Sequence, residues 1–352
     1  MTDGVLPCQS IDALIVEGTI LAKGAPITDG QVQPASLDLR LGQRAHRVRA
    51  SFLAGEGRSV ADRLAEFEMH SFAIGNGAVL ERGCVYLVPL EEALALPPDL
   101  SATCNAKSST GRLDLLTRVI TDDGSEFDRV PPGYRGPLWV EICPRSFSVV
   151  IDAGLALCQI RFRRGEARLD DEALASLHEA ERLVDRPALI EDGLRFSVDL
   201  AREGIVGWRA KPHSGAVDMR RVAAHEAAEF WEPLHARRDH LILDPGAFYI
   251  LVSREAVHIP PGYAAEMAPY LAMVGEFRVH YAGFFDPGFG HGTPARGVLE
   301  VRCHEAPFVL EHGQVVGRLV YERMAERPSR LYGAGLGSNY QGQGLKLSKH
   351  FA

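Results

Sequence analysis

The chain reads Gly83-Cys84-Val85-Tyr86-Leu87-Val88, and about 160 residues later it reads Gly246-Ala247-Phe248-Tyr249-Ile250-Leu251. Each stretch starts at a glycine and is soon followed by a Pro-Pro pair, which is typical of a β-strand between turns. Further motifs recur around these stretches in the same order: Ser36–Leu39 and Ser197–Leu200, Pro132–Tyr134 and Pro287–Phe289, Trp139–Glu141 and Val298–Glu300, Gly154–Phe162 and Gly313–Tyr321. The repeat predicts two units of one fold, and their divergence predicts one site assembled from unlike halves.

Composition excludes several classes of protein. With 352 residues, of which 46% are hydrophobic, the chain has room for two domains with real cores. A net charge of −8 argues against a nucleic-acid partner, which usually binds a basic surface. It does not exclude a phosphorylated small molecule, because Mg²⁺ and a few local cations can hold a triphosphate.

The sequence also bears on the cellular compartment. The N-terminus has no basic region followed by an apolar run, and no stretch approaches the roughly 18 apolar residues of a membrane span. We therefore expect a cytoplasmic protein without a membrane partner. The six cysteines include no Cys-x-x-Cys pair, so we expect reduced thiols in the core.

Short strands rich in Val, Ile, Leu and aromatic residues, broken by Gly and Pro, fill residues 33–162 and 194–323. Helical spacing is limited to residues 9–18, with Ser10 as the predicted N-cap, to 60–70 and to 167–184. The pattern predicts an all-β fold of sandwich, jelly-roll or small-barrel type. The tail from 329 to 352 is rich in glycine and polar residues, with little to bury.

The boundaries follow from these patterns. We predict a first repeat over residues 1–165, a short helical connector over 166–190 and a second repeat over 191–352. Each repeat is long enough to be a complete domain, so the chain is a tandem of two domains and not a solenoid.

The stretch Lys107-Ser108-Ser109-Thr110-Gly111-Arg112 is the first candidate for a binding site. Two cations and three hydroxyls within six residues suit a phosphate cradle, with Arg112 as a planar fork and Lys107 as a point charge. An ordinary polar turn leading into a helix explains the same residues equally well. The second repeat has Pro269–Gly275 at this place, without a cation, and cannot hold phosphate in the same way.

A second candidate lies at residues 278–288. Asp286-Pro287-Gly288 is a turn signal flanked by apolar residues, which predicts a β-hairpin. Asp286 is suited to accept a hydrogen bond from a sugar hydroxyl, although an aspartate at this position also commonly caps its own turn. The first repeat has Val130-Pro131-Pro132-Gly133 there and lacks the carboxylate.

Glu300 lies within the apolar stretch Gly297–Val301, and Glu141 occupies the matching place in the first repeat. A carboxylate buried in such a strand is costly unless it is paired or functional. Burial would raise its pKa and suit it to general acid/base work. An outward-facing strand residue is the alternative.

Several catalytic patterns are absent from the sequence. No His is followed two residues later by Glu, and no Cys-x-x-Cys occurs, so a deaminase-type zinc site is not expected. No P-loop and no Gly-x-Ser-x-Gly elbow is present. We expect no metal held by the protein alone.

Taken together, these motifs resemble the dCTP deaminases, relatives of the trimeric dUTPases. The resemblance spans almost the whole chain outside 163–190, and its two-repeat form looks like the long deaminases of some bacteria. The similar motifs are Gln33–Gly42 (N-terminal signature), Lys107–Arg112 (Arg-Ser-Ser-x-x-Arg phosphate motif, with Lys in place of the first Arg), Val279–Gly288 (base-recognition hairpin, one residue shorter), Val298–Glu300 (catalytic strand), and Tyr332 with Asn339–Gln343 (C-terminal tail, with Asn339 where many members have Lys).

The resemblance implies a fold and a site. It implies two tandem dUTPase-like domains, each a distorted jelly roll (β-clip), with sites formed between neighbouring domains. The cradle of the first repeat and the hairpin, Glu300 and tail of the second would form one competent site, within a chain or between chains. The reciprocal site, which would combine the hairpin of the first repeat around Val130–Gly133 with Pro269–Gly275, would be inactive.

The implied reaction is metal-independent hydrolytic deamination of dCTP to dUTP and ammonia in pyrimidine deoxynucleotide synthesis. Glu300 would act as general acid/base, with Glu141 as the second candidate, while Arg112 and Ser108 place the water. Mg²⁺ would arrive with the triphosphate, and no zinc is implied. The implied substrate-binding residues are Lys107, Ser108, Ser109, Thr110, Gly111, Arg112, Ala282, Gly283, Asp286, Val298, Leu299, Glu300, Tyr332, Asn339 and Gln343.

Two rival functions stay open at this point. One is a dUTP pyrophosphatase, or a bifunctional enzyme that makes dUMP from dCTP, in which Asp286 would activate the water. The other is a non-catalytic nucleotide-binding regulator. Inhibition by dTTP, known for some relatives, and self-association are likewise left open by the sequence.

Overall fold

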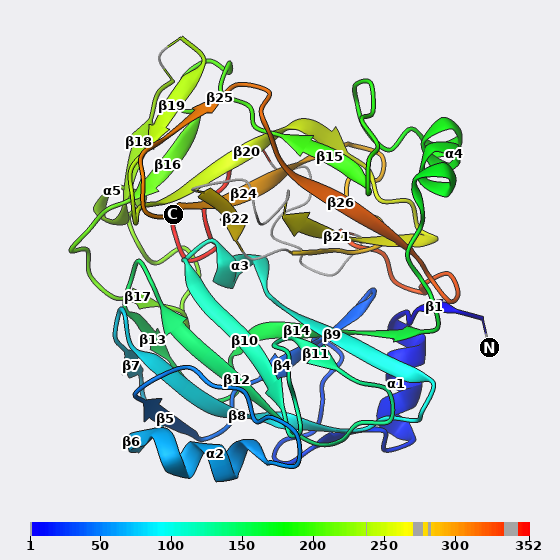
Figure 1. Ribbon diagram of the computed structural model, residues 1–352, viewed down its shortest axis with the longest axis vertical. Helices are drawn as coiled ribbons and strands as arrows, with labels where there is room; N and C mark the ends of the chain where they lie inside the picture. The colour runs from blue at the N-terminus through cyan, green and yellow to red at the C-terminus, as the bar shows by residue number, and fades with distance from the viewer. Residues whose placement is uncertain (1, 237, 270–276, 281–282, 334–343) are drawn as a thin grey trace.

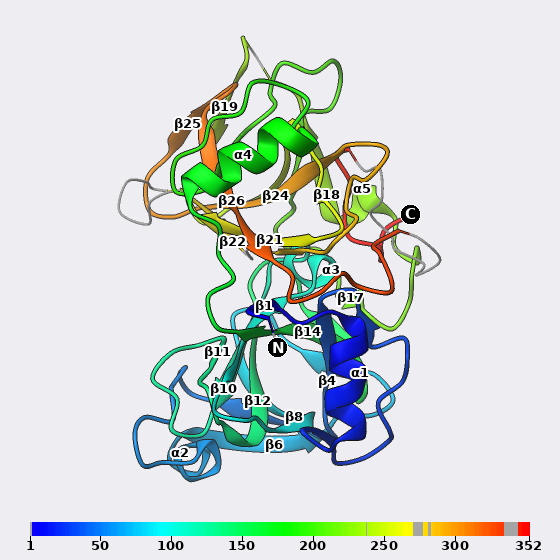
Figure 2. The ribbon, with the colours of Figure 1, turned by 90° about the vertical axis from the view of Figure 1, so that its right-hand side faces the viewer.

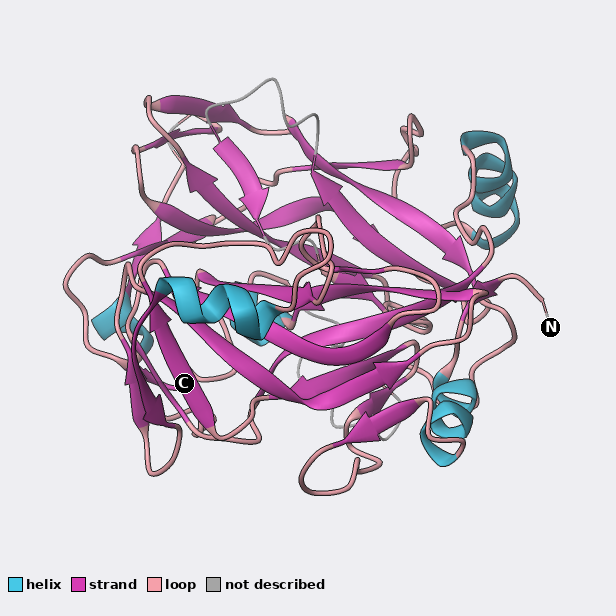
Figure 3. Ribbon diagram, turned by 60° about the horizontal axis from the view of Figure 1, so that its bottom comes forward, coloured by secondary structure: helices cyan, strands magenta, loops and turns pink. Residues whose placement is uncertain are grey.

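The structure is a computed structural model that describes residues 2–236, 238–269, 277–280, 283–333 and 344–352. Strands dominate it and the few helices lie at its periphery or between the sheets (Figure 3). The predicted all-β class is confirmed. No helix in the described part of the chain is long and apolar enough to cross a membrane.

The elements follow one another as two groups. The first group is β1 (Gly4–Val5), α1 (Cys8–Val16), β2 (Ile20–Ala22), β3 (Val32–Gln33), β4 (Ser36–Arg40), β5 (Arg44–Val48), α2 (Val60–Phe67), β6 (Glu68–Ala73), β7 (Ala78–Leu80), β8 (Val85–Ala95), β9 (Leu100–Ala106), α3 (Ser108–Gly111), β10 (Leu115–Thr121), β11 (Arg129–Val130), β12 (Arg135–Pro144), β13 (Val149–Ile151) and β14 (Ala156–Arg164). The second group is α4 (Asp171–Glu181), β15 (Leu194–Ser197), β16 (Gly207–Ala210), β17 (Val217–Asp218), α5 (Ala227–Phe230), β18 (Trp231–Leu234), β19 (His240–Leu243), β20 (Phe248–Val257), β21 (Tyr263–Pro269), β22 (Phe277–His280), β23 (Phe284–Phe285), β24 (Ala295–Cys303), β25 (Phe308–Glu311) and β26 (Val315–Arg323).

The two groups pair their strands in the same order. In the first, β9-β14-β4 lie together in one sheet and β10-β12-β8 in another. In the second, β21-β26-β15 lie in one sheet and β22-β24-β20 in another. The strands that carry the repeated sequence motifs therefore occupy equivalent places in two domains, which are stacked one above the other in Figure 2.

Two apolar cores hold the domains, and the first core crosses the boundary between them. Buried side chains of the first domain pack with Trp231, Phe248, Ile250, Val298 and Phe351, all from the second half of the chain. Burying such a side chain is worth about 1.5–3 kcal/mol relative to leaving it exposed. The short strand β17 also pairs with β13, so the boundary is a packed seam.

The predicted helices are present with one correction. A helix runs through the connector as α4, and the side chain of Asp170 caps it by accepting a hydrogen bond from the Ala173 backbone N–H at 2.8 Å. The predicted Ser10 cap is wrong, because α1 begins at Cys8 after Pro7 and has no side-chain cap. Ser10 donates instead to Glu326 at 2.8 Å. All six cysteines are free.

Candidate active site

The Lys107–Arg112 segment, the phosphate cradle, lies at the seam between the domains. It follows β9 directly and folds into the single-turn helix α3, in which the backbone N–H groups of Thr110 and Gly111 donate to the Lys107 carbonyl at 2.8 and 3.0 Å. Figure 1 shows α3 between the sheets of the two domains. The segment is thus both a turn leading into a helix and a basic edge facing the second domain.

The hydroxyls of the cradle are not equally exposed. Ser109 and Thr110 are buried, and among the described residues the Thr110 hydroxyl has no hydrogen-bond partner. Ser108 is only partly buried. Ser108 is therefore the most accessible of the three residues, and contact of Ser109 and Thr110 with a ligand stays a prediction.

Lys107 forms an ion pair with Asp38 of β4. Burial raises the pKa of the Asp38 carboxyl, and the Lys107 ammonium opposes that shift. Asp38 belongs to strand β4, whose motif was expected only to mark the family and not to act in the site. Its position shows that it orients the first cation of the cradle.

Glu300 lies in β24, between Ile250 of β20 and His280 of β22 in the backbone register. It is 7% exposed, so the outward-facing alternative is wrong. Burial raises its pKa well above the usual value, Arg112 lowers it and Asp114 raises it further. A carboxyl group in this state keeps its proton to a higher pH than an exposed one does, which suits it to general acid/base work. Arg112 belongs to the first domain of the same chain. The phosphate cradle and strand β24 therefore meet within one chain.

Asp286 is held by the first domain. Its Oδ1 accepts a hydrogen bond from Nη2 of Arg161 at 3.1 Å, and Arg161 in β14 is fully buried. Burial raises the pKa of Asp286, and the adjacent Arg161 guanidinium opposes that shift. Sequence reasoning missed Arg161, although a cation within the apolar stretch Leu157–Phe162 is itself a signal of a buried partner.

The strands on either side of the Asp286–Gly288 turn, β22 and β24, pair antiparallel as the predicted hairpin requires, but β23 departs from it. Strand β22 pairs with β24, whereas β23 pairs with β21 in the other sheet. Strands β22 and β23 thus belong to different sheets, and we call residues 278–288 the base loop. The predicted turn is present, since the Phe289 backbone N–H donates to the Asp286 carbonyl at 3.0 Å, and Asp286 lies against Arg161.

Gly288 and Tyr332 close the end of the base loop. The Tyr332 backbone N–H donates to the Pro287 carbonyl at 2.8 Å, and its ring lies 5.6 Å from that of Phe289. Gly288 has a φ of +93°, and a Cβ there would lie 3.1 Å from the Tyr332 nitrogen. Only glycine fits this left-handed, close approach.

Other predicted residues have plainer surroundings. The side chains of Val298 and Leu299 lie in the two cores, so only their backbone can contact a ligand. Glu141, the second candidate base, is bound by Arg118 within the first domain. The Gly283 carbonyl accepts from Met267 N–H at 3.2 Å. Ala282, Asn339 and Gln343 lie outside the described residues.

The segment 344–352 contradicts the expectation of a tail with little to bury. The Lys346 carbonyl accepts a hydrogen bond from Nη1 of Arg112 at 3.0 Å, and the Ser348 hydroxyl donates to the Ser109 carbonyl at 2.7 Å. Phe351 packs between the rings of Phe230 and Trp231, 5.4 and 5.9 Å away. The last residues of the chain therefore line the cradle (red in Figure 1).

Lys349 adds a cation beside Lys107. Burial and the Lys107 charge lower the pKa of Lys349, while Asp38 raises it. The cradle thus has three cations in the described residues, Lys107, Arg112 and Lys349. The third was missed because nothing in the sequence spacing links residue 349 to residue 107. In the described part of the chain, no group of three or more His, Cys, Asp or Glu is arranged to hold a metal ion.

Comparison with known proteins defines the class. The chain matches two family models, described as 2'-deoxycytidine 5'-triphosphate deaminase (DCD) N-terminal domain, over residues 2–166, and C-terminal domain, over residues 170–351. The chain belongs to this dCTP deaminase family and is an enzyme of that class. The resemblance inferred from the sequence motifs is confirmed.

A solved structure and two curated relatives support the assignment. The crystal structure of 2'-deoxycytidine 5'-triphosphate deaminase from Agrobacterium tumefaciens aligns with a TM-score of 0.90 at 56% identity, covering 96% of this chain and 100% of that one. A dCTP deaminase from Halorubrum lacusprofundi is 29% identical over 150 residues, 42% of this chain and 71% of the relative. A dUMP-forming dCTP deaminase from Dictyoglomus thermophilum is 27% identical over 164 residues, 45% of this chain and 79% of the relative.

Proposed function

We propose that the protein hydrolyses the C4–N bond of dCTP, giving dUTP and ammonia, at a site formed within one chain by the cradle of the first domain and by β24 and the base loop of the second. The observation that carries the proposal is the position of Glu300, a buried carboxyl group of raised pKa that interacts with Arg112 across the domain seam. Family membership supplies the reaction class.

The cradle would bind the triphosphate. Lys107, Arg112 and Lys349 would supply the positive charge, and the Ser108 hydroxyl a hydrogen bond. Lys107 would exchange Asp38 for a phosphate oxygen, since its ammonium is already held at this edge. Mg²⁺ would arrive as part of the substrate, bound to phosphate oxygens and not to a cage of protein ligands.

The base loop would bind the nucleoside. Asp286, held by Arg161, would accept a hydrogen bond from the deoxyribose 3′-hydroxyl. Main-chain groups around Gly283 and of Val298 and Leu299 would contact the base. Tyr332, which packs on the end of the base loop, would lead the following tail over the substrate and exclude water.

The chemistry would need one carboxyl group and one water. Ionised Glu300 would take a proton from water as the oxygen bonds to C4, and would pass that proton to N3, which gives a tetrahedral intermediate. Glu300 would then move the proton of the new C4 hydroxyl to the amino group, so that the C4–N bond breaks and ammonia leaves. Proton transfer of this kind typically contributes about 10²–10⁴-fold. Arg112 would favour the ionised form of Glu300 and orient the water.

The test is incubation of the purified protein with dCTP and Mg²⁺, resolving dUTP, dUMP, pyrophosphate and ammonia. We expect dUTP and ammonia in equal amounts. Production of dUMP with pyrophosphate would make the enzyme bifunctional, as the name of the Dictyoglomus relative describes for that protein. Binding of dCTP without any product would contradict the proposal and identify a regulator.

The same assay addresses inhibition. Because dTTP shares the triphosphate and the 3′-hydroxyl of dCTP, it would contact the same cradle and Asp286. We propose that it competes with dCTP, so that it raises the apparent KM and leaves kcat unchanged. A lower kcat at saturating dCTP would place dTTP elsewhere.

A further inference from the structure

The cradle and β24 are joined by a second pair of charges. Asp114 lies two residues after Arg112, and Arg302 lies two residues after Glu300 on the same face of β24. Nε of Arg302 is 3.4 Å from Oδ1 of Asp114, and its Nη2 contacts Oδ2. Both side chains are buried, with Asp114 at 0% and Arg302 at 9% exposure. The Asp114–Arg302 pair therefore lies next to the Arg112–Glu300 interaction, with the charges reversed.

Each partner is fixed from its own domain. The Ser146 hydroxyl donates to Oδ2 of Asp114 at 2.6 Å, and the Asp114 carbonyl accepts from the Arg145 backbone N–H at 3.0 Å. On the other side, Nη1 of Arg302 donates to the Gly246 carbonyl at 2.5 Å. The pair thus connects a rigid turn in the first domain to a strand end in the second.

Asp114 combines a left-handed backbone conformation with a buried charge. Asp114 has a φ of +55°, in the left-handed region where glycine is the unstrained residue. A buried ion pair also adds little stability over an apolar pair of similar size. Aspartate tolerates this backbone conformation, so the stronger indication is the desolvated charge pair, which is more readily explained by positioning than by stability.

We infer that the Asp114–Arg302 pair is a positioning element that sets the alignment of Arg112 with Glu300 across the domain seam. The inference rests on the proposed function. Asp114 also adds to the upward pKa shift of Glu300, so it acts on the carboxyl group through its charge as well as through alignment.

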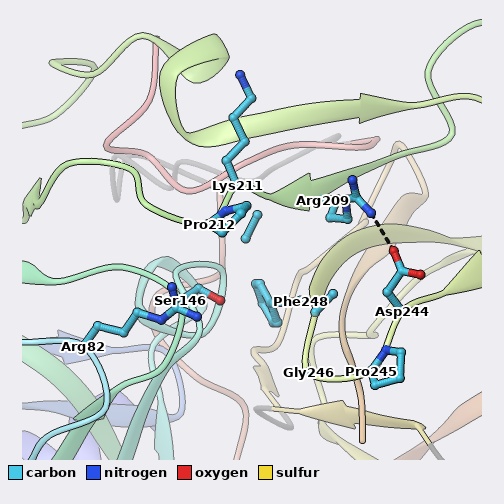
Figure 4. Close-up of a pocket in the computed structure, with 11 residues that line it drawn as sticks. Arg82, Ser146, Arg209, Lys211, Pro212, Asp244, Pro245, Gly246 and Phe248 are labelled. Atoms are coloured by element: carbon cyan, nitrogen blue, oxygen red, sulfur yellow. Dashed lines mark hydrogen bonds and ion pairs between the residues drawn. The ribbon is translucent and has the colours of Figure 1, made fainter. Parts of the chain in front are cut away.

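A cavity of about 290 Å³ lies between the domains, and Figure 4 shows residues that line it. Its lining includes Ser146 and Gly246, the two residues that hold the pair from either side, together with Arg209 and Asp244. Neither Glu300 nor Arg112 lines it. Asn has the shape of Asp, and Gln is shorter than Arg, so neutral amides at residues 114 and 302 add no bulk to the seam.

The test is the neutral double variant Asp114→Asn/Arg302→Gln, compared with wild type for dCTP turnover, dCTP binding and thermal unfolding. Removing both charges avoids the unpaired buried charge that either single variant would leave. We expect a folded protein whose Kd for dCTP changes by less than about 3-fold and whose kcat falls by at least about 10-fold, since only transition-state alignment is lost.

A matched control uses Arg209→Gln/Asp244→Asn, which removes the ion pairs of Arg209 with Asp244 and with Glu232, both of 2.6 Å, at the cavity. The control should leave both kcat and Kd unchanged. A folded Asp114→Asn/Arg302→Gln variant with kcat within about 3-fold of wild type would overturn the inference. If wild type itself makes no product from dCTP, the proposed function fails, and this outcome is distinct from failure of the inference.

A second variant covers the case in which the double variant does not fold. Ser146→Ala removes the hydroxyl that orients Asp114 and keeps the ion pair. We expect a kcat lowered by about 3-fold or more at unchanged Kd, because the carboxylate can then rotate. An unchanged kcat in this folded variant would equally overturn the inference.

Discussion

Arg161 of the first domain and Asp286 of the second are joined by a hydrogen bond of 3.1 Å, and the same guanidinium lies 3.3 Å from Glu322 and 3.0 Å from the Ala265 carbonyl. The carboxylate assigned to the sugar is thus oriented by a residue some 125 positions earlier in the chain. An isolated second domain would present Asp286 without this partner.

Arg161→Met should destabilise the protein strongly. The substitution leaves the buried carboxylates of Asp286 and Glu322 with less compensation, and breaking a buried pair in this way typically costs about 3–5 kcal/mol. Chemical denaturation measures the loss. Arg318→Met, which removes an exposed pair with Asp192, is the control and should have little effect. Equal, small losses for both variants would show that Arg161 is not needed to compensate the carboxylates.

Asp286→Ala should weaken dCTP binding by about 10- to 100-fold, because a hydrogen bond to a charged group is worth about 1.5–3 kcal/mol. Calorimetry with dCTP measures the effect. The matched ligand is 2′,3′-dideoxy-CTP, which lacks the 3′-hydroxyl and should bind wild type and variant alike. If the variant weakens both ligands equally, Asp286 does not contact that hydroxyl.

Glu300→Gln should lower kcat by about 10²–10⁴-fold, since the amide can neither accept nor deliver the proton. Glu141→Gln is the matched control: it changes the equivalent residue of the first domain, which is bound to Arg118, and should leave turnover intact. Steady-state rates with dCTP measure the kcat of both variants. The reverse result, with Glu141→Gln inactive and Glu300→Gln active, would reverse the assignment.

The same variant should change the pH dependence of stability. Burial raises the pKa of Glu300 above its ordinary value of 4.5, so the folded protein keeps a proton that the unfolded chain has lost above that pH. Wild type therefore loses stability as the pH rises above about 4.5 towards the folded-state pKa. Glu300→Gln lacks this loss, and its Tm relative to wild type should increase from pH 4 to pH 8. A difference that is flat or decreases with pH would contradict the raised pKa.

Lys349→Met should raise the Kd for dCTP by about 10-fold and weaken its salt dependence, because one of three cations near the triphosphate is removed. Titrations at two salt concentrations measure both effects. The control is Lys211→Met, whose ammonium is bound to the Ala228 carbonyl away from the cradle. Equal affinities of the two variants for dCTP would show that Lys349 does not bind the triphosphate.

The sequence was sufficient for the fold class and for the main halves of the site. Alternating apolar strands, glycine turns and repeated motifs are local patterns, and they gave the all-β class and the cradle, Asp286 and Glu300 as candidates. The apolar neighbours of Glu300 made burial one of two alternatives, and its exposure of 7% decides for burial. The Lys107–Arg112 spacing located the cations of the first domain.

What the sequence could not give depends on contacts between distant residues. Arg161, Asp38 and Lys349 act through partners far away in the chain, so no spacing rule connects them to the site. The turn at Asp286–Gly288 follows from a local pattern, whereas the pairing of β23 with β21 in the other sheet is decided by tertiary packing. The burial of residues 344–352 depends on a distant contact in the same way, because Phe351 packs against the rings of Phe230 and Trp231.

The meeting of cradle and β24 within one chain has an evolutionary consequence. In a symmetric assembly of identical subunits, a substitution appears in every copy of the site at once. In this chain, the equivalent positions of the two domains are separate codons. The first domain can therefore have Pro131 at the position where the second domain keeps Asp286. Natural selection can act on each half of the site alone.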